Sequence, residues 1–147
     1  MSAPWDRLPS IVGDDGAEML RRFRAAVEGA FPNRLGAVVL FGARARENAK
    51  PDSDWEVAVF IEDLERSSEG RRLSLLAVPF HAEGFYVSPL GLPADRTPVS
   101  PDLLASIDCE GIPVPSPQGL TADEFHYWRR DQPDLHELIQ GQPVRMA

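Results

Sequence analysis

Two apolar stretches decide the fold, Leu35-Gly-Ala-Val-Val-Leu-Phe-Gly42 and Asp54-Trp-Glu-Val-Ala-Val-Phe-Ile61. Continuous apolar runs of this length are typical of strands that are buried on both faces of a sheet. Gly42 ends the first run, and Pro51-Asp52-Ser53 forms a turn before the second. We therefore expect residues 37–41 and 54–61 to be neighbouring strands of one mixed sheet.

Helices are predicted around these strands. Residues 15–30 carry apolar side chains mostly at spacings of three and four, which favours a helix that packs against the sheet. Asp14 or Asp15 would cap this helix, after an irregular lead-in over residues 1–13. Residues 43–49 would form a short helix directly after Gly42.

The rest of the chain continues the alternation of helix and strand. Thr121 and Glu124 have the spacing of a capping box, which predicts a helix from there through Arg130. The other expected elements are a helix over 63–78, a strand over 85–90, a helix over 101–110 capped by Ser100, an extended segment over 112–117 and a helical turn or two over 134–139. The fold class is thus α/β (α+β), a mixed sheet flanked by helices.

Composition bounds the class of protein. The 147 residues are 43% hydrophobic, which suits one core and one domain over 1–147, with its centre at about residues 15–115 and a helical extension at about residues 120–140. The net charge of −8 argues against direct nucleic-acid binding. No apolar run approaches the roughly 20 residues of a membrane helix. No leader is visible, so we expect a cytoplasmic protein.

Gly42 and the pair Asp54 and Glu56 carry the chemistry. A glycine between a buried strand and a helix leaves free amide N–H groups that attract phosphate, and Arg44 and Arg46 lie in the same segment. Asp54 and Glu56 stand two apart at the head of the next strand, so their side chains share a face. Mg²⁺ prefers carboxylate oxygens and keeps substrate phosphates as further ligands. The segment therefore predicts the handling of a nucleoside triphosphate, without a P-loop motif.

The segment Gly42-Ala-Arg-Ala-Arg-Glu47, followed by a spacer, Ser53-Asp-Trp-Glu56 and Val57-Ala-Val-Phe60, resembles the minimal nucleotidyltransferases of the DNA polymerase β-like superfamily. Their signature reads roughly Gly-Ser-x-Ala-x-Gly, a spacer, Ser-Asp-x-Asp and a hydrophobic strand. Downstream, Arg96-Thr97-Pro98 and the segment from Leu103 to Gly111, with Ile107 and Glu110, are similar to the part that closes the domain in many small members. The resemblance covers roughly residues 15–115.

The resemblance implies a polymerase β-like fold and transfer of a nucleoside monophosphate from a nucleoside triphosphate to a hydroxyl. In the family, two Mg²⁺ ions are held by three carboxylates, and here Asp54 and Glu56 would be metal ligands and catalytic residues. The residues implied in nucleotide binding are Gly42, Ala43, Arg44, Arg46 and Ser53.

Four departures from the family pattern predict weak nucleotide binding and slow or undetectable transfer. They are Ala43 in place of serine, Glu47 in place of the second glycine, Glu56 in place of aspartate, and a strand over 85–90 without a third carboxylate, since Glu83 precedes it and Asp95 follows it. A longer carboxylate at position 56 matters because Mg²⁺ demands near-ideal octahedral geometry.

Other interpretations remain open. One is a degenerate binding module that regulates a partner, as small members of this family pair with helical HEPN-type toxins as antitoxins. Another is an unrelated α/β scaffold in which Asp54 and Glu56 are solvated charges at a strand end. His81, His126, His136 and Cys109 lack metal-ligand spacing and are expected to be structural.

Overall fold

The computed structural model describes residues 6–130, 132 and 136–146, and a four-stranded sheet runs through its centre in the order β3-β2-β1-β4. β1 lies antiparallel to β2 and β4, whereas β2 and β3 are parallel. The prediction of neighbouring strands in one mixed sheet is therefore confirmed. The strands are β1 (Leu35–Phe41), β2 (Trp55–Ile61), β3 (Val87–Pro93) and β4 (Ile112–Pro113).

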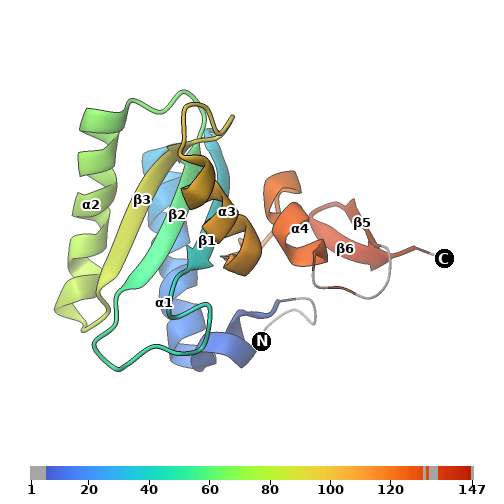
Figure 1. Ribbon diagram of the computed structural model, residues 1–147, viewed down its shortest axis with the longest axis horizontal. Coiled ribbons are helices and arrows are strands. Elements are labelled where there is room, and N and C mark those ends of the chain that lie inside the picture. Colours follow the sequence, from blue (N-terminus) through green and yellow to red (C-terminus); the bar gives the residue numbers. More distant parts are fainter. Residues whose placement is uncertain (1–5, 131, 133–135, 147) are drawn as a thin grey trace.

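Helices cover both faces of this sheet (Figure 1). α1 (Leu8–Ala30) and α2 (Arg66–Ala82) share a core with Trp55, Val57, Val59 and Ile61 of β2. The alternate residues Ala58 and Phe60 face the other way, toward α3 (Pro101–Glu110) and α4 (Ala122–Arg129). β2 is thus buried on both faces, which is why its sequence reads as a nearly continuous apolar run.

The C-terminal part of the chain forms a small layer of its own beside β1. α4 is followed by a two-stranded hairpin, β5 (His136–Ile139) and β6 (Gln142–Arg145). Leu120, Phe125 and Trp128 form a third apolar cluster, against which Leu138 of β5 packs. α4 packs within the molecule through this cluster and through Tyr127, which joins the core under α3.

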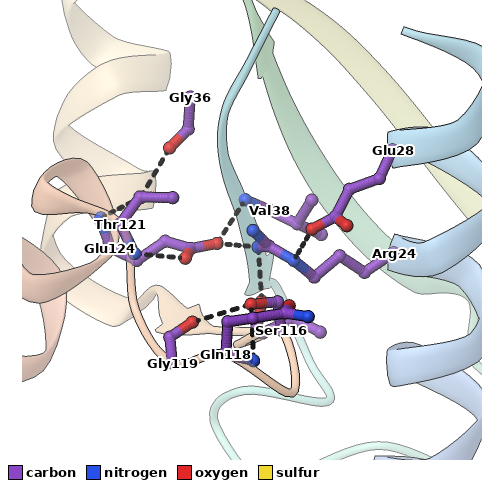
Figure 2. Close-up of polar contacts among 10 residues, drawn as sticks. Arg24, Glu28, Gly36, Val38, Ser116, Gln118, Gly119, Thr121 and Glu124 are labelled. Carbon is purple, nitrogen blue, oxygen red and sulfur yellow. Dashed lines mark hydrogen bonds and ion pairs between the residues drawn. The ribbon is translucent and has the colours of Figure 1, made fainter. Parts of the chain in front are cut away.

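A buried polar cluster attaches α4 to the sheet (Figure 2). Glu124 forms an ion pair with Arg24 of α1 and accepts a hydrogen bond from the Val38 N–H of β1 at 3.2 Å. Arg24 also donates to the Val114 carbonyl at 2.8 Å. The Thr121 hydroxyl donates to the Gly36 carbonyl at 2.6 Å, and the predicted capping box is present. This cluster joins α1, β1 and α4 through groups that are removed from water.

Two expectations at the N-terminal side were wrong. The lead-in is not irregular throughout, because α1 begins at Leu8; Gly13, with a φ of 81°, interrupts the helix just before the expected start. Residues 43–47 form successive turns and 48–49 are irregular, so the short helix expected over 43–49 is not formed. An isolated helix of this length is marginal, and no apolar stripe along it would secure it to the sheet.

Three further expectations change in extent or kind. Residues 136–139 form a strand and not a helical turn, while 134 and 135 lie outside the described residues. The extended segment over 112–117 contributes only Ile112–Pro113 to the sheet. Ser100 stands at the N-cap of α3 but its side chain makes no capping hydrogen bond. Within the described part of the chain, no helix is both long and apolar enough to cross a membrane.

Candidate functional site

The candidate site lies where β1 ends and β2 begins. Gly42 follows β1 with a φ of +77°, and a Cβ atom built on it would lie 1.9 Å from Glu56 Oε2. Both the left-handed backbone and the missing space explain why this position is glycine. The carboxylate of Glu56 therefore rests directly against the Gly42 turn.

Asp54 and Ser88 lie beside Glu56. In the parallel pairing of β2 and β3, Ser88 is the register partner of Glu56, and its hydroxyl donates to Asp54 Oδ2 at 3.2 Å. Trp55 and Val57 point to the opposite face, into the core of α1 and α2. The structure thus places Glu56 against the Gly42 turn and Asp54 in contact with Ser88 of the neighbouring strand, whereas metal binding and catalysis by these residues stay predictions.

The backbone donors of the turn are partly engaged. The Gly42 N–H donates to Glu110 Oε1 at 3.1 Å, and the Ala45 and Arg46 amides both donate to the Gly42 carbonyl at 3.1 Å. Within the described residues, the amides of Ala43 and Arg44 have no protein acceptor. These two amides are therefore the free backbone donors that an anion could use, although no helix stands behind them.

The side chain of Arg44 is not with the carboxylates. Its guanidinium lies over the Trp55 ring, 4.2 Å from the centroid, on the face of the sheet covered by α1. Nη2 donates to the carbonyls of Pro51 at 3.2 Å and Ser53 at 2.9 Å. Burial lowers the pKa of Arg44, and its Nε atom is buried without a hydrogen-bond partner among the described residues. Arg44 therefore braces the loop from residue 43 to residue 54.

Arg46 and Ser53 are likewise engaged within the protein. Arg46 Nη1 pairs with Glu110 Oε2 at 2.7 Å. The Ser53 hydroxyl accepts a hydrogen bond from the Lys50 N–H at 2.8 Å, and the Ser53 N–H donates to the Lys50 carbonyl at 3.0 Å. Ser53 thus closes the turn that leads into β2.

The carboxylates that precede and follow β3 lie elsewhere. Glu83 pairs with Arg22 at 2.8 Å, which lowers the pKa of Glu83, and Asp95 accepts from the Thr97 N–H at 3.0 Å. In the described part of the chain no three His, Cys, Asp or Glu side chains are grouped so that they could hold a metal ion. Two carboxylates fit a single Mg²⁺ that arrives with substrate phosphates, but not a protein-bound pair of ions.

Glu47 has a left-handed backbone conformation within the turn that follows β1. Its φ is +60°, in the left-handed region that glycine enters readily and other residues enter at a cost. The backbone at this position therefore has a conformation that glycine adopts without strain and glutamate adopts at a cost.

Two residues of this site had no role in the sequence-based prediction. Ser88 is recognised only through the register of β2 and β3, and Glu110 reaches Gly42 across 68 positions of the chain. Glu110 was noted in the sequence only as part of the downstream segment that resembles the family. Its contact with Gly42 was found from the three-dimensional structure.

Comparison with known proteins shows that the chain resembles solved structures in its fold. No protein-family model matches the chain, and no curated protein matches it. A chain of a toxin–antitoxin complex solved with AMP-PNP is 17% identical, with a TM-score of 0.54 over 75% of this chain and 82% of its own. A chain of the MntA–HepT toxin–antitoxin complex is also 17% identical, with a TM-score of 0.50 over 77% and 81%.

A third solved structure is a mutant of the MntA toxin–antitoxin complex in which two aspartates, two positions apart, are glutamates. Its matching chain is 16% identical, with a TM-score of 0.53 over 75% of this chain and 82% of its own. At such identities the likeness concerns the fold, and it agrees with the expected mixed sheet flanked by helices.

Proposed function

We propose that this chain is a nucleotidyltransferase-like module that binds a Mg²⁺–nucleoside triphosphate weakly at the Gly42 turn and transfers the nucleoside monophosphate to a hydroxyl slowly. The observation that carries this proposal is the Glu56 carboxylate against Gly42, beside the free amides of Ala43 and Arg44. One of the solved structures of similar fold contains AMP-PNP, a nucleotide analogue, which supports the choice of ligand.

The residues fit binding better than transfer. Asp54 and Glu56 would hold one Mg²⁺, which offsets the negative charge that develops on the phosphates. The two free amides would hold a phosphate oxygen, but Ala43 has no hydroxyl to add a third hydrogen bond. A hydrogen bond to a charged group is worth about 1.5–3 kcal/mol. Because no third carboxylate orients an acceptor hydroxyl, we expect the rate of transfer to be reduced more than the affinity for the nucleotide.

A transfer assay with labelled nucleoside triphosphates tests the proposal. We expect slow transfer by the wild-type chain, none by Asp54→Ala, and faster transfer by the double variant Ala43→Ser, Glu56→Asp. Fast wild-type transfer that disappears in Asp54→Ala would show an ordinary enzyme and contradict the weak site. If neither the wild type nor the double variant transferred the nucleotide, the proposed transfer would be wrong and the regulatory binding module described next would be favoured.

The second candidate is a regulatory module that binds a partner protein, with a helical HEPN-type toxin as the partner class. The observation that favours it is that the similar folds occur in toxin–antitoxin complexes. If a neighbouring gene encodes a helical toxin, co-expression of the two proteins tests this candidate. A tight complex, together with absent transfer by the chain alone and by the double variant, would support regulation over catalysis.

A further inference from the structure

The carboxylate of Glu110 occupies donors at the turn where a phosphate would bind. Glu110 is the last residue of α3, and its Oε1 accepts the Gly42 N–H at 3.1 Å. Its Oε2 pairs with the Arg46 guanidinium at 2.7 Å. One carboxylate thus bridges a backbone amide and an arginine, as an oxygen pair of a bound phosphate would.

The position of Glu110 on its helix makes this contact informative. A helix C-terminus carries the negative end of the helix dipole, so a carboxylate in the last turn is disfavoured by its own helix. The interactions that favour it come from outside the helix, from Gly42 and Arg46. The Glu110 side chain is 19% exposed and that of Arg46 is 49% exposed, so an anion from solvent can reach this pair.

We propose that Glu110 is a built-in competitor for the polyphosphate chain of a nucleotide at the Gly42 turn. This inference rests on the proposed function, because it concerns the same turn. With Glu110 in place, the turn offers a polyphosphate the Ala43 and Arg44 amides. Without the Glu110 carboxylate, the Gly42 amide and the Arg46 guanidinium become available as well, and a negative charge beside the bound phosphates is removed.

Titration with inorganic triphosphate tests this competition directly, by calorimetry and by the NMR shifts of the Gly42 and Ala43 amides. Glu110→Ala frees both donors. We expect this variant to bind triphosphate at least about tenfold more tightly than the wild type, because a single hydrogen bond to a charged group is enough for a tenfold gain in affinity. Glu110→Gln removes the charge but keeps a neutral acceptor for Gly42, so its gain should be smaller, about threefold. It also serves as the test if Glu110→Ala does not fold.

Asp108→Ala is the matched control. Asp108 lies on the same helix, carries the same charge and pairs with Arg96 at 3.1 Å, away from the turn. Its affinity for triphosphate should stay within about twofold of the wild type at physiological salt, where charges beyond about 8 Å are screened. If Asp108→Ala increased the affinity for triphosphate as much as Glu110→Ala, the change in net charge alone would explain the effect, and the proposal would be overturned.

The remaining outcomes are also decisive. Unchanged or weaker triphosphate binding by the Glu110 variants would show that Glu110 braces the turn and does not compete at it. Tighter triphosphate binding without any nucleotidyl transfer would support the competition while the proposed transfer fails. Equal nucleotide binding by wild type and variants would leave the proposed function standing and overturn the competition.

Discussion

At the scale of single residues, the turn depends on the hydrogen side chain of Gly42. The conformation at Gly42 is left-handed, and the Glu56 carboxylate occupies the place of a Cβ atom. We expect Gly42→Ala to lower the free energy of unfolding by more than about 2 kcal/mol, as overpacking and left-handed strain add. In a Glu56→Ala background only the strain, roughly 1 kcal/mol, should remain. Urea unfolding of the wild type, Gly42→Ala, Glu56→Ala and the double variant measures the overpacking and the strain separately. If Gly42→Ala lowered the free energy of unfolding equally in both backgrounds, the contact between Gly42 and Glu56 would be contradicted.

Glu47 offers the converse substitution. Because its φ is +60°, Glu47→Gly should relieve left-handed strain of roughly 1–2 kcal/mol, partly offset by the greater entropy of glycine in the unfolded chain. Glu47→Ala removes the same charge without relieving the strain and is the control. We expect the glycine variant to be more stable than the alanine variant by about 1 kcal/mol in urea unfolding. The reverse order would mean that the turn is not strained at this position.

Prediction from sequence succeeded for these residues where the cause was local. The end of β1 at Gly42 was predictable because this glycine ends an apolar run, whereas the shared face of Asp54 and Glu56 stays a prediction from the period of a strand. The place of Arg44 was not predictable, because its stacking on Trp55 depends on which face of the sheet the loop crosses. The engagement of Arg46 by Glu110 depends on where α3 ends in space.

At the scale of elements, the buried pair Arg24 and Glu124 joins α1 to α4. Removing one partner of such a pair leaves an uncompensated buried charge, so Arg24→Met should cost about 3–5 kcal/mol of unfolding free energy. The double variant Arg24→Met, Glu124→Gln leaves no buried charge and should be more stable than Arg24→Met alone. Denaturant unfolding of the two single variants and the double variant measures the coupling. Additive costs would show that the ion pair contributes nothing of its own.

A second ion pair holds the start of α2 to the loop before β1. Arg34 donates to both carboxylate oxygens of Glu69, at 2.7 and 2.8 Å, and these hydrogen bonds lower the pKa of Glu69 to about 2. A depressed folded pKa adds stability that is present above the unfolded value of 4.5 and is lost as the pH falls toward 2. Glu69→Gln should therefore flatten the fall in stability between pH 5 and pH 2.

Arg34→Met removes the main cause of that shift and should flatten the same pH range. Thermal unfolding followed across this range, at low salt, measures the slope for both variants. A slope that persists in either variant would assign the acid sensitivity to other carboxylates, among them Glu65, whose pKa is also lowered to about 2 by hydrogen bonds from Ser68.

The elements that sequence patterns did not reveal are those fixed by distant pairing. Residues 136–139 contain helix-compatible residues, yet they form β5 because a two-residue turn with positive φ at Gln140 and Gly141 folds β6 back onto them. β4 is a strand only because it meets β1. By contrast β1 and β2 were predictable from continuous apolar runs, because both faces of each strand are buried. α1 was predictable from apolar side chains at spacings of three and four, because one face of the helix packs against the sheet.

At the scale of the whole molecule, the C-terminal hairpin and the candidate site are separate in space (Figure 1). The loop after β1 lies at one end of the sheet, whereas α4 and the hairpin lie beside β1 and β4 (Figure 1). The Glu110 contact with Gly42 involves no residue beyond α3. Stability and nucleotide binding should therefore respond differently to changes at the C-terminus.

Two truncations separate these properties. A chain that ends at residue 131 loses the hairpin and exposes Trp128, Phe125 and Leu120, which should cost roughly 2–4 kcal/mol because burying a large apolar side chain contributes about 1.5–3 kcal/mol. Its affinity for inorganic triphosphate should match the full chain. A chain that ends at residue 118 also loses Glu124, leaves Arg24 buried without its carboxylate and should not fold cooperatively. If the shorter chain melted like the longer one, α4 would be an appendage and not part of the core.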